Sequence, residues 1–109
     1  MVEIPKDQVP QQSEEKGKPV ARARVMITGD VIGVGFRWFL HNMAEEIEAT
    51  GYVRNLDDGR LEAVFEGDKN QVETMISHCR SGPETAHVTG VQVVWEYPEG
   101  KWDELEIGY

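Results

Sequence analysis

Residues 21–47 read ARARVMITGDVIGVGFRWFLHNMAEEI, and two different periodicities flank the glycine-containing loop in the middle of this stretch. Up to Ile27, charged residues alternate with small or apolar ones, which is typical of a half-buried strand. From Phe36 onward, apolar residues recur at offsets of 0, 3, 4, 7 and 11, which is typical of a helix with one apolar face. The stretch therefore predicts a strand that ends at residues 28–30, then a loop, then a helix.

The next segment of the chain predicts a hairpin and a second helix. Residues 52–56 and 60–66 are predicted as two strands, and Asp57-Asp58-Gly59 between them favours a tight turn because Asp-Gly tolerates positive φ. The inward side chains of the second strand are expected to be Leu61, Ala63 and Phe65. The helix is expected to begin after the N-cap Asp68 and to end at residue 79 or 80. Its apolar face would consist of Val72, Met75, Ile76 and Cys79.

Two more strands complete the predicted fold. The alternating positions are Val91, Val93, Trp95 and Tyr97 in a long strand, and Leu105, Ile107 and Tyr109 in a short closing strand. The element order is β-α-β-β-α-β with one extra strand. We therefore predict an α+β fold, a two-layer α/β sandwich of the ferredoxin-like type with an antiparallel sheet and a short extra C-terminal strand. Because that architecture hosts many unrelated activities, function has to be argued from the site.

The first nineteen residues differ from the rest of the chain. Three prolines interrupt a segment that is rich in Gln, Ser, Glu and Lys and contains few apolar residues. Such a segment buries too little apolar surface to offset its ordering entropy. We predict a disordered N-terminal tail over residues 1–19 and one folded domain over residues 20–109, which suits a length of 109 residues.

The composition argues against several classes of function. The formal net charge is −9, whereas a sequence-independent nucleic-acid binder or a protein adsorbed to an anionic membrane needs a basic surface. Cys79 is the only cysteine, so neither an intrachain disulfide nor a Cys-based zinc site can form. The sequence shows no secretory signal and no apolar run long enough to span a membrane. We expect a cytoplasmic protein with no nucleic-acid or membrane partner.

The loop between the first strand and the first helix has the features of an anion site. Gly33 and Gly35 let backbone amides turn inward, and the loop leads directly into a helix N-terminus, which attracts anions. Arg37 lies in the first turn, where its planar fork can hold two phosphate oxygens. A bound anion would also offset the unfavourable interaction of this arginine with the helix dipole. Taken alone, the pattern fits a tight turn beside a solvated arginine equally well, because it is neither a P-loop nor a dinucleotide fingerprint.

The motifs around this loop resemble those of the acylphosphatase family. The matching segments are Gly33-Val34-Gly35-Phe36-Arg37, Gly51-Tyr52-Val53-Arg54-Asn55, Asp58-Gly59, Glu62-Ala63, Glu66-Gly67 and Ser81-Gly82-Pro83. Agreement of several motifs in order and distance is specific. The resemblance implies hydrolysis of the carboxyl–phosphate bond of acyl phosphates to a carboxylate and inorganic phosphate, without a metal or an organic cofactor.

The resemblance also implies a role for each residue of the site. Arg37 would bind the phosphoryl group together with the loop amides, and Asn55 would orient the attacking water. The phosphate-binding amides would belong to Ile32, Gly33, Val34, Gly35 and Phe36. The expected partners are a small-molecule acyl phosphate as substrate and inorganic phosphate as product and competitive ligand, with the chain acting as a monomer.

Three residues depart from the family pattern. Ile32 stands where glutamine is common, so a side-chain hydrogen bond is lost while the backbone N–H remains. Tyr52 replaces the usual tryptophan. Glu48 stands where a glycine often ends the first helix, so we expect a frayed or extended helix end. We expect these changes to affect the rate more than the existence of the activity.

The remaining candidates carry weaker signals. Arg54 is expected to be a solvated strand residue or an ion-pair partner rather than a catalytic group. His41 lies on the helix that follows the loop, off its apolar face, where it could approach the site. Trp38 and Trp102 either line a substrate mouth or are ordinary surface aromatics. The histidines lack the spacing of a metal-ligand pair: His41, His78 and His87.

Two other functions compete with an enzyme. Acylphosphatase-like modules also occur in hydrogenase-maturation carbamoyltransferases, so the alternative is a non-catalytic binding or accessory domain. The sequence shows no attached zinc-finger region, which favours the stand-alone enzyme. An RNA-recognition domain has a similar topology, but Leu61–Phe65 is too acidic and aliphatic for base stacking. We therefore predict an acylphosphatase and reject the RNA-binding alternative.

Overall fold

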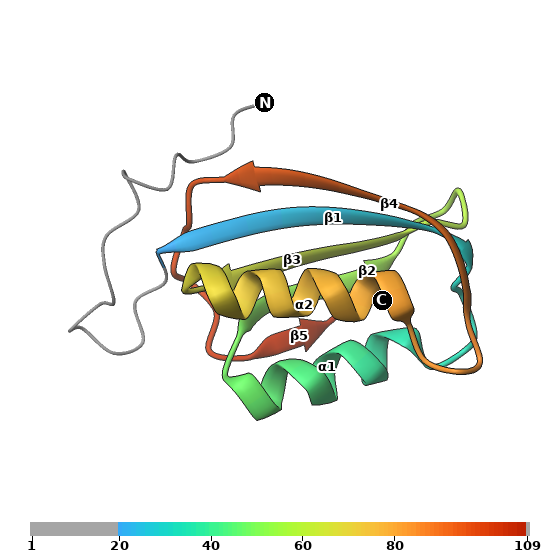
Figure 1. Cartoon of the computed structure of the whole chain (residues 1–109), viewed down its shortest axis with the longest axis horizontal. Coiled ribbons are helices and arrows are strands. Elements are labelled where there is room, and N and C mark those ends of the chain that lie inside the picture. The colour runs from blue at the N-terminus through green and yellow to red at the C-terminus, as the bar shows by residue number, and fades with distance from the viewer. Residues whose placement is uncertain (1–19, 109) are drawn as a thin grey trace.

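The computed structural model describes residues 20–108, so the predicted tail over residues 1–19 and the predicted strand residue Tyr109 lie outside the described part. Strands and helices follow one another in the predicted order (Figure 1). No helix in the described part is long and apolar enough to cross a bilayer. The elements are β1 (Ala21–Asp30), α1 (Phe36–Ile47), β2 (Thr50–Asn55), β3 (Leu61–Gly67), α2 (Lys69–Ser81), β4 (His87–Glu96) and β5 (Leu105–Ile107).

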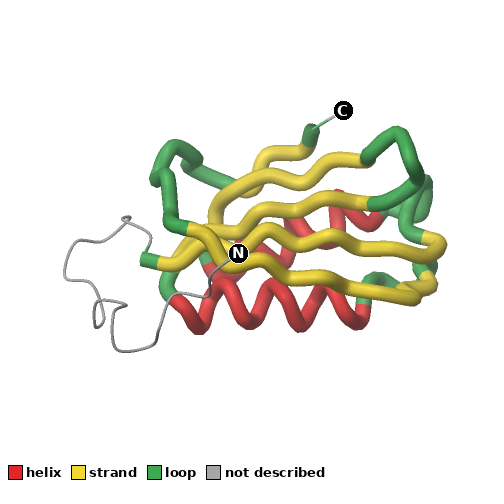
Figure 2. Tube along the Cα trace, turned by 90° about the horizontal axis from the view of Figure 1, so that it is seen from above, coloured by secondary structure: helices red, strands yellow, loops and turns green. Residues whose placement is uncertain are grey.

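The five strands form one sheet in the order β4-β1-β3-β2-β5. Neighbours among the first four strands are antiparallel, as predicted, whereas β5 runs parallel to β2, with Leu105 beside Gly51. The sheet is therefore mixed. Figure 2 shows both helices on the same side of the sheet, so the predicted two-layer ferredoxin-like α+β sandwich is confirmed.

The core lies between the sheet and the two helices. Alternation along β3 directs Leu61, Ala63 and Phe65 toward the helices, and all three are fully buried, as predicted. The helices cover them with residues at helical spacing, which is how an amphipathic helix buries one face. These helix residues are Phe36, Leu40 and Ala44 of α1, and Val72, Met75, Ile76 and Cys79 of α2.

The ends of two strands can be compared with the prediction. β1 ends at Asp30, within the predicted residues 28–30, and its register shifts between Thr28 and Gly29. Gly29 has φ 126°, and a Cβ there would lie 2.1 Å from the His87 carbonyl oxygen, so the glycine permits a bulge inside the strand. The predicted end of β4 was wrong: Tyr97, predicted as the last alternating residue of the strand, follows its end at Glu96 and is 75% exposed.

The two helices end differently from one another. The prediction of a frayed or extended end at Glu48 was wrong, because Glu48 takes the left-handed conformation (φ 62°, ψ 31°) that glycine usually supplies. Its N–H bonds to the carbonyls of Ala44 and Glu45, so α1 stops at Ile47. The predicted N-cap of α2 is confirmed, since the Asp68 carboxylate accepts from the Gln71 N–H at 2.8 Å in a capping box.

The face of the sheet away from the helices carries a network of charges that also fixes the β4–β5 connection. The Glu66 carboxylate is fully buried and accepts from Nη1 of Arg22 at 2.9 Å. It also accepts from the backbone amides of Glu99 and Gly100 at 2.7 and 2.9 Å. The guanidinium of Arg22 lies 5.3 Å from the ring centre of Trp102 in the same connection. Glu66 therefore anchors the segment that leads into β5.

Candidate active site

The loop over residues 31–35 joins β1 to α1 and depends on two glycines. Gly33 has φ 76° and Gly35 has φ 79°, a region that L side chains rarely adopt. A Cβ at either position would meet no atom within 4 Å, so backbone conformation rather than space requires glycine here. Gly35 is also the N-cap of α1 and supplies no side chain to the end of the helix.

The backbone amides of this loop lie at the N-terminus of α1. None of the backbone N–H groups from Ile32 to Phe36 donates a hydrogen bond to an acceptor within residues 20–108. The first turn of α1 contains no acidic side chain to complement the helix dipole. Free N–H groups at a helix N-terminus attract an anion. The five amides of the predicted cradle are consecutive in this loop and lead into the N-terminus of α1.

A contact that the sequence did not predict holds the loop in place. The Thr85 hydroxyl, in the connection between α2 and β4, donates to the Val34 carbonyl oxygen at 2.6 Å. The central carbonyl of the loop is therefore satisfied by a residue 51 positions away. Nothing in the identity of Thr85 signals this contact, because any hydroxyl at a chain reversal can make it.

Arg37 lies in the first turn of α1, as predicted, and is half-buried. Its Nη1 donates to the carbonyl oxygen of Gly108 at 2.6 Å, just beyond the end of β5. Guanidinium carries five N–H donors, and this bond with Gly108 uses one of them. That Gly108 is the acceptor could not be predicted from the sequence.

Asn55 is the last residue of β2. Alternation along that strand places Asn55 on the same face as the buried Gly51 and Val53, which is the face that the helices cover. The N–H of Gly108 donates to the Val53 carbonyl oxygen at 2.7 Å, so the residue that holds Arg37 also pairs with the strand of Asn55. The side chain of Asn55 makes no hydrogen bond to any residue of the described part.

Arg54 belongs to the opposite face of the sheet. Its Nε donates to the Glu62 carboxylate at 2.6 Å, and this hydrogen bond raises the pKa of Arg54 above its ordinary value. Of the two predicted roles for Arg54, a solvated strand residue or an ion-pair partner, the structure shows the ion pair.

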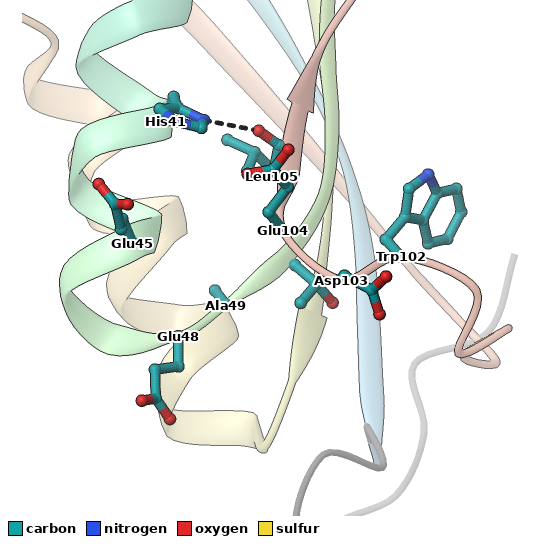
Figure 3. A pocket seen from close by; sticks show the side chains of 9 residues that line it. His41, Glu45, Glu48, Ala49, Trp102, Asp103, Glu104 and Leu105 are labelled. Atoms are coloured by element: carbon teal, nitrogen blue, oxygen red, sulfur yellow. Dashed lines mark hydrogen bonds between the residues drawn. The ribbon is translucent and has the colours of Figure 1, made fainter.

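A cavity of about 490 Å³ lies between α1 and the connection that enters β5 (Figure 3). His41 is at one end of it, and Nδ1 of its ring is 2.7 Å from the Leu105 carbonyl oxygen. Trp102 lines the cavity and packs against Tyr52 at 5.7 Å between ring centres. Trp38 is 57% exposed and meets the His41 ring edge to face. The acidic residues that line the cavity are Glu45, Glu48, Asp103 and Glu104.

The histidines do not come together, in agreement with their spacing in the sequence. His78 lies on α2 against Phe39, and His87 begins β4. No group of three or more His, Cys, Asp or Glu side chains within residues 20–108 is placed to hold a metal ion.

Comparisons with known proteins identify the family of the chain. Residues 23–107 match the family model described as Acylphosphatase. The chain is 52% identical over 82 residues to the acylphosphatase of Roseiflexus sp. (strain RS-1), which covers 75% of this chain and 88% of the relative.

Comparison with solved structures also identifies acylphosphatases. The structure is similar to that of acylphosphatase from Bacillus subtilis, with a TM-score of 0.77, 30% identity and coverage of 82% of this chain and 99% of that chain. It also resembles part of T. kodakarensis HypF, with a TM-score of 0.71 and 28% identity, where 82% of this chain matches only 12% of that chain. From the family match and the identity of its relatives, the chain belongs to the acylphosphatase family and is a hydrolase of acyl phosphates.

Proposed function

We propose that Arg37 and the amides of residues 32–36 bind the phosphoryl group of the substrate, and that Asn55 orients the water that attacks it. The observation that carries this proposal is the run of five amides at the N-terminus of α1, just before Arg37, that donate to no acceptor within residues 20–108. Amides in that position offer fixed donors and a partial positive charge to a phosphate.

The reaction breaks the bond between phosphorus and the bridging carboxyl oxygen. The oxygen of water forms a new bond to phosphorus, and the bridging oxygen leaves with its electron pair as part of the carboxylate. Phosphoryl transfer has a loose transition state with charge spread over three equatorial oxygens, so its catalysis is mainly positioning and electrostatic stabilisation. The amides and the Arg37 guanidinium supply both without a cofactor.

The role of Asn55 follows from the chemistry of its amide. A carboxamide is neutral, accepts through Oδ1 and donates through Nδ2, so it holds a water molecule without removing a proton from it. The proton of the water passes to an oxygen of the substrate's phosphoryl group. Support for this role comes from the position of Asn55 at the end of β2, on the face covered by α1, with a side chain that no described residue engages.

The physiological partners follow from the same site. The substrate is a small-molecule acyl phosphate, and inorganic phosphate competes with it because both present the same oxygens to the cradle. We propose that the chain acts as a monomer, since the groups in the proposed roles all come from one copy. A non-catalytic phosphate-binding domain is the competing function, and the similarity to a segment of HypF is the observation that favours it.

The decisive experiment is release of inorganic phosphate from benzoyl phosphate in the presence of EDTA, by the native protein, Arg37→Ala and the control Arg80→Ala. Arg80 is an exposed arginine on α2. We expect turnover that persists in EDTA, is kept by Arg80→Ala and falls about a hundredfold or more in Arg37→Ala. Turnover by Arg37→Ala within a few fold of native would refute the role of Arg37. Folded native protein that binds phosphate without turnover would favour the binding domain.

A further inference from the structure

We propose that His41 is a positioning residue for the reaction, because it fixes the position of β5, whose end holds Arg37. This inference rests on the proposed role of Arg37. The imidazole Nδ1 of His41 lies 2.7 Å from the Leu105 carbonyl oxygen (Figure 3). A carbonyl oxygen only accepts, so Nδ1 carries the hydrogen and donates it.

Both ends of β5 are attached to the same face of α1. Arg37 and His41 are four residues apart on the helix, a spacing that puts two side chains on one face. Arg37 bonds to Gly108, just after β5, and His41 bonds to Leu105, the first residue of β5. The two side chains therefore bond to the backbone at the start of the strand and just after its end.

The strand is short and has one neighbour in the sheet. β5 contains three residues, lies at the edge of the sheet and pairs only with β2 within the described part. Backbone bonds of Gly51 to Glu104 and of Gly108 to Val53 hold it to β2. A strand of this length also needs support from packing against a helix. Toward α1, the buried Leu105 and the hydrogen bond from His41 supply that support.

Loss of the hydrogen bond between His41 and Leu105 would change the position of the Arg37 guanidinium. Gly108 follows β5 directly, so movement of the strand moves the carbonyl oxygen that directs the guanidinium. A guanidinium whose direction is less well fixed binds an anion less well, since ordering it then costs conformational entropy at each binding event. Trp38, which meets the His41 ring edge to face at 5.5 Å, helps to hold the ring in the donating orientation.

The test compares His41→Leu, His41→Asn and the control His78→Leu, with Arg37→Ala measured alongside. Asn keeps a donor near the position of Nδ1, whereas Leu removes it. His78 also meets an aromatic ring edge to face, that of Phe39 at 6.0 Å, but has no bond to β5. The readouts are kcat and KM for benzoyl phosphate, the inhibition constant of inorganic phosphate and the thermal unfolding midpoint.

We expect His41→Leu to raise the KM and the phosphate inhibition constant by roughly three- to tenfold, the effect of one hydrogen bond. His41→Asn should restore both to within about twofold of native, and His78→Leu should leave both unchanged. Native binding by His41→Leu, or losses that follow the unfolding midpoint equally in His41→Leu and His78→Leu, would overturn the inference. Native phosphate binding by Arg37→Ala would instead refute the proposed function, and the inference with it.

A measurement on the native chain covers the case in which His41→Leu does not fold. Nitrogen-15 NMR of the three histidine rings should show Nδ1 protonated in His41. Titration with inorganic phosphate should shift the His41 resonances and leave those of His78 and His87 in place. An Nε2-protonated His41 ring, or a ring that does not respond to phosphate, would overturn the inference.

Discussion

The carbonyl oxygen of Gly108 lies 2.6 Å from Nη1 of Arg37, and the N–H of the same glycine donates to the Val53 carbonyl oxygen at 2.7 Å. Val53 precedes Asn55 by two residues on β2 and shares its face of the sheet. One residue near the end of the chain therefore links the helix of Arg37 to the strand of Asn55. The two proposed catalytic residues are thus related through the backbone of Gly108 and not through a direct contact between their side chains.

The first prediction separates the roles of these two residues. In Asn55→Ala we expect turnover to fall about a hundredfold or more, as when a transition-state donor is lost, while the inhibition constant of inorganic phosphate stays near native. The reason is that the amides and Arg37 still hold the phosphoryl group. The measurement is steady-state hydrolysis of benzoyl phosphate with phosphate as inhibitor, and exposed Asn42→Ala on α1 is the control. A rise in the inhibition constant as large as that in Arg37→Ala would place Asn55 in the anion site instead.

The second prediction concerns the buried carboxylate of Glu66. Its partner Arg22 is also buried, and Glu66 accepts two backbone amides from the β4–β5 connection. Glu66→Ala would leave two amides without their acceptor and Arg22 without its fully buried partner, although Arg22 keeps its bond to Glu96. We therefore expect a loss of about 3 kcal/mol in the free energy of unfolding. Urea denaturation measures this loss.

The matched control for Glu66 is the exposed pair of Asp58 and Arg60, joined at 2.7 Å. Water and salt screen such a pair, so Asp58→Ala should cost far less stability than Glu66→Ala. Equal losses in the two variants would mean that the Glu66 network does not anchor the connection.

These buried charges mark the limit of what the sequence of β1 could predict. Alternation in residues 21–27 predicted a half-buried strand, yet Arg22 on the second face is only 3% exposed. Its partners Glu66 and Glu96 lie 44 and 74 residues away. A pattern of polarity separates two faces but does not tell which distant segments cover them. The helix-facing side of β3 was predictable, because its apolar residues recur at every second position in the sequence.

The candidate site also combines features that could be predicted from the sequence with features that could not. Gly33, Gly35 and Arg37 form a local pattern, so the loop and its helix could be predicted from neighbouring residues. The contacts of Thr85 with Val34 and of Arg37 with Gly108 could not, because their acceptors are backbone carbonyls, which every residue has. Where a side chain meets distant backbone, sequence identity gives no indication of the partner.

The third prediction is a dependence of stability on acid pH. Burial raises the pKa of Glu62, but hydrogen bonds from Arg54 and Arg24 outweigh it and hold that pKa below the ordinary 4.5. A carboxylate with a lowered folded pKa contributes stability above its unfolded pKa and loses it as pH falls through the folded value. The free energy of unfolding should therefore decrease on acidification below about 4.5.

Glu62→Gln tests this assignment by urea denaturation from neutral pH to about pH 3. The variant should be less stable than native at neutral pH and should lose less stability on acidification. Parallel curves for the two proteins would show that Glu62 titrates alike in the folded and unfolded states.

The fourth prediction uses the left-handed residue at the end of α1. Glu48 has φ 62°, which costs an L residue more than it costs glycine. We expect Glu48→Gly to raise the free energy of unfolding by roughly 0.5–1 kcal/mol, after allowing for the greater freedom of glycine in the unfolded chain. Glu45→Gly, three residues earlier and still in the helix, should lower it by about 0.5 kcal/mol. Loss of stability in both variants would indicate that the Glu48 side chain itself stabilises the helix end.

The last prediction concerns how an anionic substrate reaches an acidic protein. The chain carries a formal net charge of −9, and four carboxylates line the cavity beside α1. The long-range field therefore repels an acyl phosphate, and attraction is confined to Arg37 and the loop amides within a Debye length of about 8 Å at physiological salt. Raising salt from low to physiological strength screens the repulsion as much as the attraction, so kcat/KM for benzoyl phosphate should stay level or rise slightly. The kcat, which reports the bound complex, should not respond. A steep fall in kcat/KM over this range would mean that positive potential extends well beyond the loop and steers the substrate to the site.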